Sequence, residues 1–100
     1  MKPLGYHPEA KVELEDAIAV YEQQREGRGV KFRRAVERAE KDIQGSPKAC
    51  PKHKRRRCRE YIVRGFPYAI YYEERDDSIE IVAVKHAKRR SDYWLRRLKR

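Results

Sequence analysis

The sequence predicts a small α+β domain in which an antiparallel three-stranded meander packs against a helical hairpin. Two stretches with helical periodicity occupy the first half of the chain, and three short β-type runs occupy the second. Of the 100 residues, 39% are apolar, and they recur in periodic runs, which excludes a disordered chain. At this length we expect a single domain over residues 1–100 with few, economically packed elements.

The chain is expected to begin with a short strand over residues 2–7, followed by a helix with Pro8 at its first position. Acidic residues, Glu13 among them, lie mostly on the polar side of this helix. Its apolar stripe consists of Ala10, Leu14, Ala17, Ile18 and Tyr21.

Gly27 and Gly29 indicate a turn into a second helix, which Gly45 and Pro47 close. Two helices joined by a short glycine turn are expected to pack as a hairpin that serves as scaffold. The apolar stripe of the second helix consists of Phe32, Val36, Ala39 and Ile43.

Residues 60–64, 66–74 and 79–85 predict the three strands of the meander, with Gly65 in the first turn and residues 75–78 in the second. The element order is therefore β-α-α-β-β-β, with the helices on one face of the sheet. Strict alternation in the last run predicts one face formed by Ile79, Ile81 and Ala83 and another by Glu80, Val82 and Val84.

After the last strand, a run of cations leads to Tyr93 and Trp94. Asp92 is expected to cap a short C-terminal helical segment whose Leu95 and Leu98 pack inward.

Several residues near this end are candidates for function. His86 is interpreted either as an acid–base group or as a partly buried histidine that binds a carbonyl. Tyr93 and Trp94 either stack on a partner or hold the terminal segment against the sheet. Arg89 and Arg90 suit bidentate contacts with phosphate or carboxylate.

Net charge is uneven along the chain. Residues 1–50 carry ten Lys/Arg and nine Asp/Glu, whereas residues 51–100 carry sixteen and seven, so +9 of the total +10 lies in the second half. A concentrated positive field attracts anionic partners, either nucleic acid or an acidic protein. The basic stretch 46–58, which includes Arg57, is either a solvated loop or a phosphate-contacting loop.

No apolar stretch is long enough to span a bilayer, and residues 1–10 have no apolar core of a secretory signal. We therefore expect a cytoplasmic protein without a membrane partner, in which Cys50 and Cys58 are free thiols. With His53 these cysteines lack a fourth ligand, so no metal site and no cofactor are expected.

Five segments together resemble the RelE/ParE superfamily of bacterial type II toxins over nearly the whole chain. They are HPEAKVELEDAIAVYE, the glycine turn with GVKFRRAVERAEKDI, the P-x-x-x-P spacing of Pro47 and Pro51, VRGFPYAIYYEE, and IEIVAVKHAKRRSDYW. The resemblance implies the same β-α-α-β-β-β domain, a growth-inhibitory activity and a cognate antitoxin in a hetero-oligomeric complex.

The RelE-like branch of the superfamily implies metal-independent cleavage of mRNA on the ribosome, supported by cations on the strands. This chain departs from that pattern, because Ala69 occupies the place of a typical arginine and Glu60 and Ile62 replace lysines. A carboxylate facing phosphate would repel the substrate. The candidate catalytic residues of this alternative are Arg64, His86, Arg89 and Tyr93.

The ParE-like branch implies binding to DNA gyrase without a nuclease site, and the missing cations favour it. Whether an enzyme or not, the toxin is expected to bind an acidic, partly disordered antitoxin with salt-sensitive association. Residues expected to contact the target or the antitoxin are Arg57, Arg64, His86, Arg89, Arg90, Tyr93 and Trp94.

Overall fold

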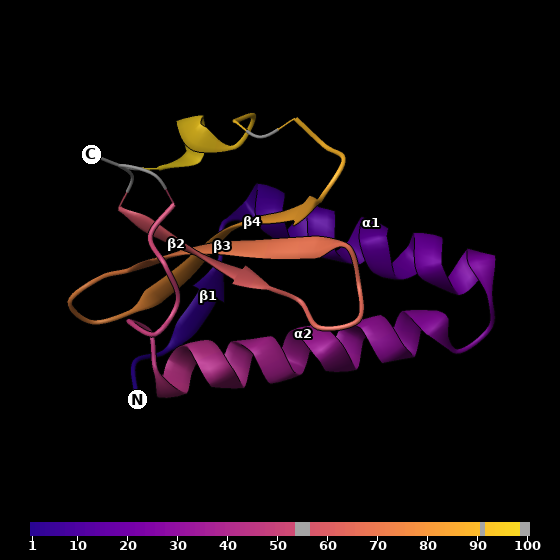
Figure 1. The fold of residues 1–100 in the computed structure, drawn as a ribbon, viewed down its shortest axis with the longest axis horizontal. Coiled ribbons are helices and arrows are strands. Elements are labelled where there is room, and N and C mark those ends of the chain that lie inside the picture. The colour runs from indigo at the N-terminus through magenta and orange to yellow at the C-terminus, as the bar shows by residue number, and fades with distance from the viewer. Residues whose placement is uncertain (54–56, 91, 99–100) are drawn as a thin grey trace.

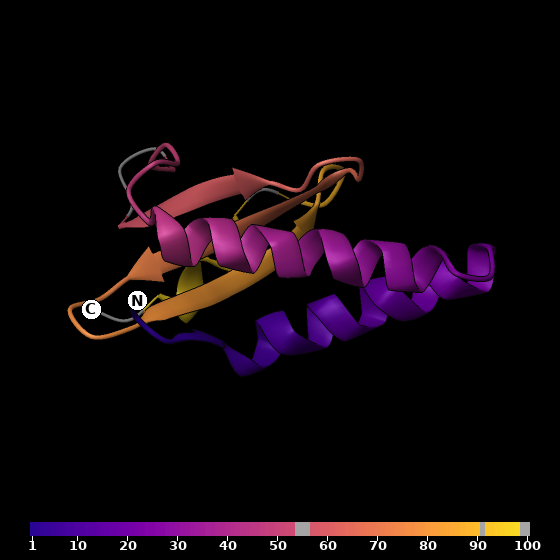
Figure 2. The same ribbon diagram turned by 90° about the horizontal axis from the view of Figure 1, so that it is seen from below.

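The computed structural model describes residues 1–53, 57–90 and 92–98 and arranges them in three layers. A helical hairpin forms one layer, a four-stranded sheet the next, and the C-terminal segment lies across the opposite face of the sheet (Figures 1 and 2). The predicted α+β class and the order of the elements are confirmed. The elements are β1 Leu4–Tyr6, α1 Pro8–Gln24, α2 Arg28–Gly45, β2 Cys58–Ile62, β3 Tyr68–Glu74, β4 Ile79–His86 and the 3₁₀ turn Leu95–Arg97.

The helical hairpin follows the predicted stripes closely. Helix α1 begins at Pro8, and the backbone N–H of Glu9 donates to Nδ1 of His7, which caps the first turn. Ala10, Leu14, Ala17 and Tyr21 of α1 and Phe32, Val36, Ala39 and Ile43 of α2 are buried between the hairpin and the sheet.

Both glycines of the hairpin turn are required by its geometry. Gly27 has a φ of +87°, a left-handed conformation that side chains rarely adopt. At Gly29 a Cβ atom would come within 2.8 Å of the carbonyl oxygen of Ile18. The carboxylate of Glu22 accepts hydrogen bonds from both glycine N–H groups, so the turn is closely packed as well as tight.

The sheet has the strand order β1-β4-β3-β2. Strands β2, β3 and β4 form the predicted antiparallel meander, and β1 adds a parallel strand on the free side of β4, a pairing that the sequence did not predict. The strand bounds differ by one or two residues from the prediction, because β2 begins at Cys58, β3 at Tyr68, and β4 continues to His86.

A β-bulge in β4 corrects the predicted alternation of that strand. Tyr71 of β3 pairs with Ala83, whereas the next residue, Tyr72, pairs with Ile81. Strand β4 therefore carries one extra residue, Val82, and every side chain beyond it changes face.

This change of face reassigns two apolar side chains, Ala83 and Val84, and sets the direction of His86. Val82 and Ala83 both pack on the face opposite the helices, called here the outer face. Val84 instead joins the core between sheet and helices, and His86, two residues further on, turns toward α1. The prediction that placed Ala83 with Ile79 and Ile81 is therefore wrong, and so is the prediction that placed Val84 with Val82.

The outer face is covered by the C-terminal segment. Trp94 is fully buried there, with its ring centre 4.5 Å from that of Tyr71. The buried outer cluster consists of Cys58, Ala69, Tyr71, Val82, Ala83 and Trp94. Leu95 and Leu98 pack against its edge, as expected, but the prediction that Asp92 caps the turn is wrong, because the residue in the cap position is Trp94 and no side chain caps the 3₁₀ turn.

Candidate functional site at the junction of helix α1 and the C-terminal segment

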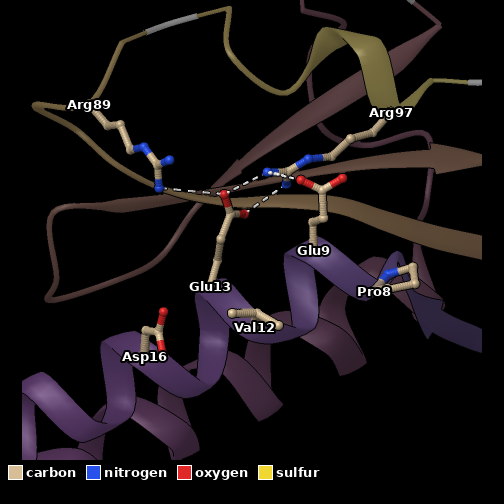
Figure 3. A pocket seen from close by; sticks show the side chains of 7 residues that line it. All are labelled: Pro8, Glu9, Val12, Glu13, Asp16, Arg89 and Arg97. Atoms are coloured by element: carbon tan, nitrogen blue, oxygen red, sulfur yellow. Dashed lines mark hydrogen bonds and ion pairs between the residues drawn. The ribbon is translucent and has the colours of Figure 1, made fainter.

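A surface pocket of about 370 Å³ lies between the first turns of α1 and the C-terminal segment (Figure 3). It contains carboxylates from the helix and guanidinium groups from the segment, so charges of both signs meet in it. The lining residues are Pro8, Glu9, Val12, Glu13, Asp16, Arg89 and Arg97.

Glu13 is the centre of this pocket. Arg97 donates to both of its carboxylate oxygens, with N–O distances of 3.0 Å. The Tyr93 hydroxyl donates at 2.6 Å, the backbone N–H of Val84 donates at 3.0 Å, and Arg89 adds an ion pair at 3.7 Å. The side chains of Glu13 and Arg97 are only 10% and 4% exposed, so this is a largely buried, multiply hydrogen-bonded ion pair.

The surroundings of Glu13 keep it ionised. Burial raises the pKa of Glu13, but hydrogen bonds from Arg97, Tyr93 and Val84 outweigh burial and leave the pKa below its ordinary value. Burial and the bond to Glu13 raise the pKa of the Tyr93 phenol, so Tyr93 remains a protonated donor. Both groups are therefore occupied in holding α1 to the C-terminal segment.

His86 lies beside this network. Its Nδ1 atom accepts a hydrogen bond from the backbone N–H of Lys88 at 3.0 Å, and its ring centre lies 5.1 Å from that of Tyr68. Together with Glu13 and Arg89 it lines a second pocket of about 140 Å³. The guanidinium of Arg89 is stacked 4.0 Å from the ring centre of Tyr93. The structure therefore brings His86, Arg89 and Tyr93 together around Glu13.

Other predicted site residues lie elsewhere. Arg57 forms an ion pair of 3.3 Å with Glu73 near the opposite end of the sheet. Arg64 lines a different pocket beside α2. Arg90 is exposed on the loop after β4. Trp94 is buried, so its side chain is not available to a partner in this structure and corresponds to the interpretation that it holds the terminal segment against the sheet.

The sequence did not predict the two central residues, Glu13 and Arg97. Glu13 was assigned to the polar side of α1, yet it follows Ala10 by three residues and precedes Ala17 by four. That spacing places it at the border of the buried stripe, a signal that could have identified it. No comparable signal distinguishes Arg97 from its neighbours Arg96 and Lys99.

The positions at which this chain departs from the RelE pattern share the outer face. Glu60 pairs with Tyr71 and Ile62 pairs with Ala69. Glu60 accepts a hydrogen bond from the Tyr71 hydroxyl at 3.0 Å, and Ala69 belongs to the outer cluster. Lys85, which pairs with Ala69, is buried and donates to the backbone carbonyl of His86. The centre of this face is therefore packed, whereas Ile62 at its edge is exposed.

Cys50 is half-buried and Cys58 is buried, and neither forms a disulfide. Across residues 1–53, 57–90 and 92–98, no three or more His, Cys, Asp or Glu side chains are grouped so that they could hold a metal ion. In the same part of the chain no helix has the length and apolarity needed to cross a bilayer.

Comparisons with known proteins agree with this architecture. Residues 4–91 match the family model described as the ParE toxin of the type II toxin-antitoxin system parDE, and the chain belongs to this family. A solved structure described as the chromosomal ParDE TA system from P. aeruginosa has the same fold, with a TM-score of 0.67 at 13% identity over 88% of this chain and 98% of that one. No curated protein sequence matches the chain.

Proposed function

We propose that this chain inhibits growth by binding DNA gyrase and that an acidic antitoxin neutralises it in a toxin–antitoxin complex. Family membership supports the toxin class, and the structure described for P. aeruginosa is that of a toxin-antitoxin system. Under this proposal residues 1–100 act as one domain in the cytoplasm, where both partners are encountered.

The composition of the outer face supports gyrase as the target in preference to mRNA. Glu60, Ile62 and Ala69 stand there in place of the cations that a RelE-like relative would use to stabilise phosphate charge. The C-terminal segment also covers this face with the fully buried Trp94. A packed face that carries a carboxylate offers little stabilisation to the negative charge of a phosphodiester during its cleavage. Binding to a protein target does not require such charge stabilisation.

One observation favours mRNA cleavage on the ribosome as a second candidate. His86 and Arg89 line one pocket and Arg89 stacks on Tyr93, so three groups that a nuclease site would use lie close together. However, the Tyr93 hydroxyl is bound to Glu13 and its pKa is raised, so it cannot serve as a base near neutral pH.

The two candidates differ in what is cut in living cells. The chain would be induced while mRNA 5′ ends and gyrase-linked DNA breaks are mapped together. DNA breaks with intact mRNA are the expected result, and cleavage of ribosome-bound mRNA without DNA breaks would contradict the gyrase proposal.

Two variants distinguish binding from catalysis in the same assay. We expect the double variant Arg89→Ala/Arg90→Ala to lose toxicity, because exposed arginines are frequent anchors of protein interfaces. His86→Ala should remain toxic. If His86→Ala alone abolishes toxicity while antitoxin affinity is unchanged, the result supports catalysis.

The antitoxin is proposed to be acidic because the chain carries a net charge of +10. Opposite charge accelerates association more than it strengthens the final complex. The association rate measured by stopped flow should therefore fall as salt rises, and a rate independent of salt would contradict electrostatic steering.

A further inference from the structure

A third pocket, of about 220 Å³, lies between α2 and the sheet-edge strand β2. It shares no lining residue with the Glu13 pocket and belongs to none of the contacts described so far. Three of its five lining residues are arginines: the set is Arg34, Ala35, Arg38, Tyr61 and Arg64. We call this site the arginine pocket.

The fold explains why these arginines converge. Arg34 and Arg38 lie four residues apart on α2, so they project from the same side of the helix. Arg64 follows the end of β2, and Tyr61 of that strand pairs with Ile70, whose side chain belongs to the core beneath the helices. Residues distant in sequence therefore line one pocket between α2 and β2. Figure 2 shows how α2 runs along the helix side of the sheet.

Tyr61 forms a fixed wall of the pocket. Its hydroxyl donates to Oδ2 of Asp42 at 2.5 Å, which holds the ring in place. Burial and this hydrogen bond raise the pKa of Tyr61 to about 12, so the ring stays neutral. The Asp42 carboxylate is thereby engaged with the phenol.

The charge of the arginine pocket is not neutralised within the described residues. Along 1–53, 57–90 and 92–98, no carboxylate oxygen lies within 4.0 Å of Arg34, Arg38 or Arg64. Like charges held close together repel one another, and an anion placed between them removes that repulsion. The pocket is therefore complementary to a negative group.

We propose that the arginine pocket binds a carboxylate side chain from an acidic segment of a protein partner. A guanidinium pair matches a carboxylate bidentately, and the volume suits one side chain.

Nucleic acid fits this site less well. A phosphate chain carries further charges beyond the one that enters the pocket. Asp42, which accepts a hydrogen bond from the pocket residue Tyr61, is a carboxylate beside the site, and Glu37 is a second carboxylate on the same helix. These carboxylates would repel successive phosphates, whereas a single acidic side chain avoids them. The inference does not depend on whether gyrase or mRNA is the target.

The test measures anisotropy of a fluorescein-labelled peptide of alternating Glu and Ala, with a single-stranded oligonucleotide of equal charge as a second probe. The pocket variant is Arg34→Gln/Arg38→Gln/Arg64→Gln. The control variant Arg25→Gln/Arg33→Gln/Lys41→Gln removes the same charge at exposed residues outside the pocket. Circular dichroism verifies that both variants are folded.

We expect the pocket variant to bind the peptide about ten-fold more weakly than the native chain, and the control variant to lose no more than about two-fold. Equal losses in the two variants would overturn the proposal, because the overall field would then account for binding. The proposal would also be overturned if the pocket variant weakened the oligonucleotide as much as the peptide, since the site would then recognise phosphate.

Discussion

The Glu13 pocket and the arginine pocket both contain arginines at the border of a helix and a neighbouring segment. The two pockets differ in whether those arginines are paired with a carboxylate. In the Glu13 pocket the side chain of Arg97 is 4% exposed, and its two terminal nitrogens donate to the two carboxylate oxygens of Glu13. In the arginine pocket, within the part of the chain that the structure describes, Arg34, Arg38 and Arg64 have no such carboxylate. The first pocket is suited to holding the fold together, and the second to binding something else.

The difference shows that net charge along the sequence does not by itself identify which cations lack a carboxylate partner. The sequence assigns +9 to residues 51–100, yet Arg57, Arg75, Arg89, Arg96 and Arg97 from that half all form ion pairs. Several of the matching carboxylates come from α1. Arg34 and Arg38, in contrast, belong to the nearly neutral first half, so the tertiary pairing decides which cations remain available.

Removing Arg97 should have the largest effect. Arg97→Met leaves Glu13 largely buried without its main partner, and we expect a loss of about 3 kcal/mol in the free energy of unfolding. Urea denaturation followed by Trp94 fluorescence measures it. Arg96→Met is the control, because its exposed ion pair with Glu9 should contribute less than about 1 kcal/mol. Equal losses in the two variants would show that the buried pair is not what stabilises the segment.

Protonation of Glu13 in acid should lower the free energy of unfolding by less than the Arg97→Met substitution does. Because the folded-state pKa of Glu13 lies below its ordinary value of 4.5, the unfolded chain binds more protons as pH falls below that value. The contribution of Glu13 is therefore complete above about pH 4.5 and is lost as pH falls through the folded-state pKa. Arg97 keeps its hydrogen bond to the carbonyl of Val82 when Glu13 is protonated, which limits the loss.

Denaturation of the native chain and Glu13→Gln at a series of pH values provides the measurement. The native chain should be more stable near neutral pH, and the difference should shrink in acid. Glu74, whose pKa is lowered to about 2 by hydrogen bonds from Lys2 and Lys48, titrates equally in both proteins and does not enter the comparison. A difference that stays constant down to about pH 2 would contradict a role for the Glu13 charge.

Removing one hydroxyl from the Glu13 pocket should have a smaller effect. Tyr93→Phe deletes the donor to Glu13 while preserving the ring against which Arg89 stacks, and we expect a loss of about 1 kcal/mol. Thermal unfolding compares it with Tyr61→Phe, which deletes the exposed hydrogen bond to Asp42 and should cost less. A larger loss of stability in Tyr61→Phe than in Tyr93→Phe would contradict the view that the Glu13 pocket contributes more to stability than the arginine pocket.

The smallest effect is expected in the arginine pocket. Arg34→Gln/Arg38→Gln/Arg64→Gln removes charges that contact no carboxylate among the described residues, so the free energy of unfolding should change by less than about 0.5 kcal/mol. A slight increase would agree with relieved repulsion. A loss comparable to that of Arg97→Met, measured by the same urea titration, would mean that these arginines stabilise the fold.

Much of the fold could be predicted because it depends on local patterns. The spacing of Leu14 and Ala17 defines a buried stripe, Gly27 permits a left-handed turn, and alternation in residues 66–74 defines a strand. Each signal lies within a few residues of the structure that it specifies. His86 ends β4, and Arg89 and Tyr93 follow within seven residues, so these three are already close in sequence, whereas Arg64, the fourth candidate, lies elsewhere.

The site itself depends on contacts between distant residues. The bulge at Val82 turns Val84 and His86 toward α1, and Glu13 then meets Arg97 across a separation of 84 residues. A bulge shifts side-chain parity without an obvious change in residue type, so alternation alone could not predict it. Ion pairing likewise depends on which charges the folded chain places within a few ångströms. Residue pattern was thus sufficient for the layers of this toxin, whereas tertiary packing decided which arginines stabilise it and which remain free to bind.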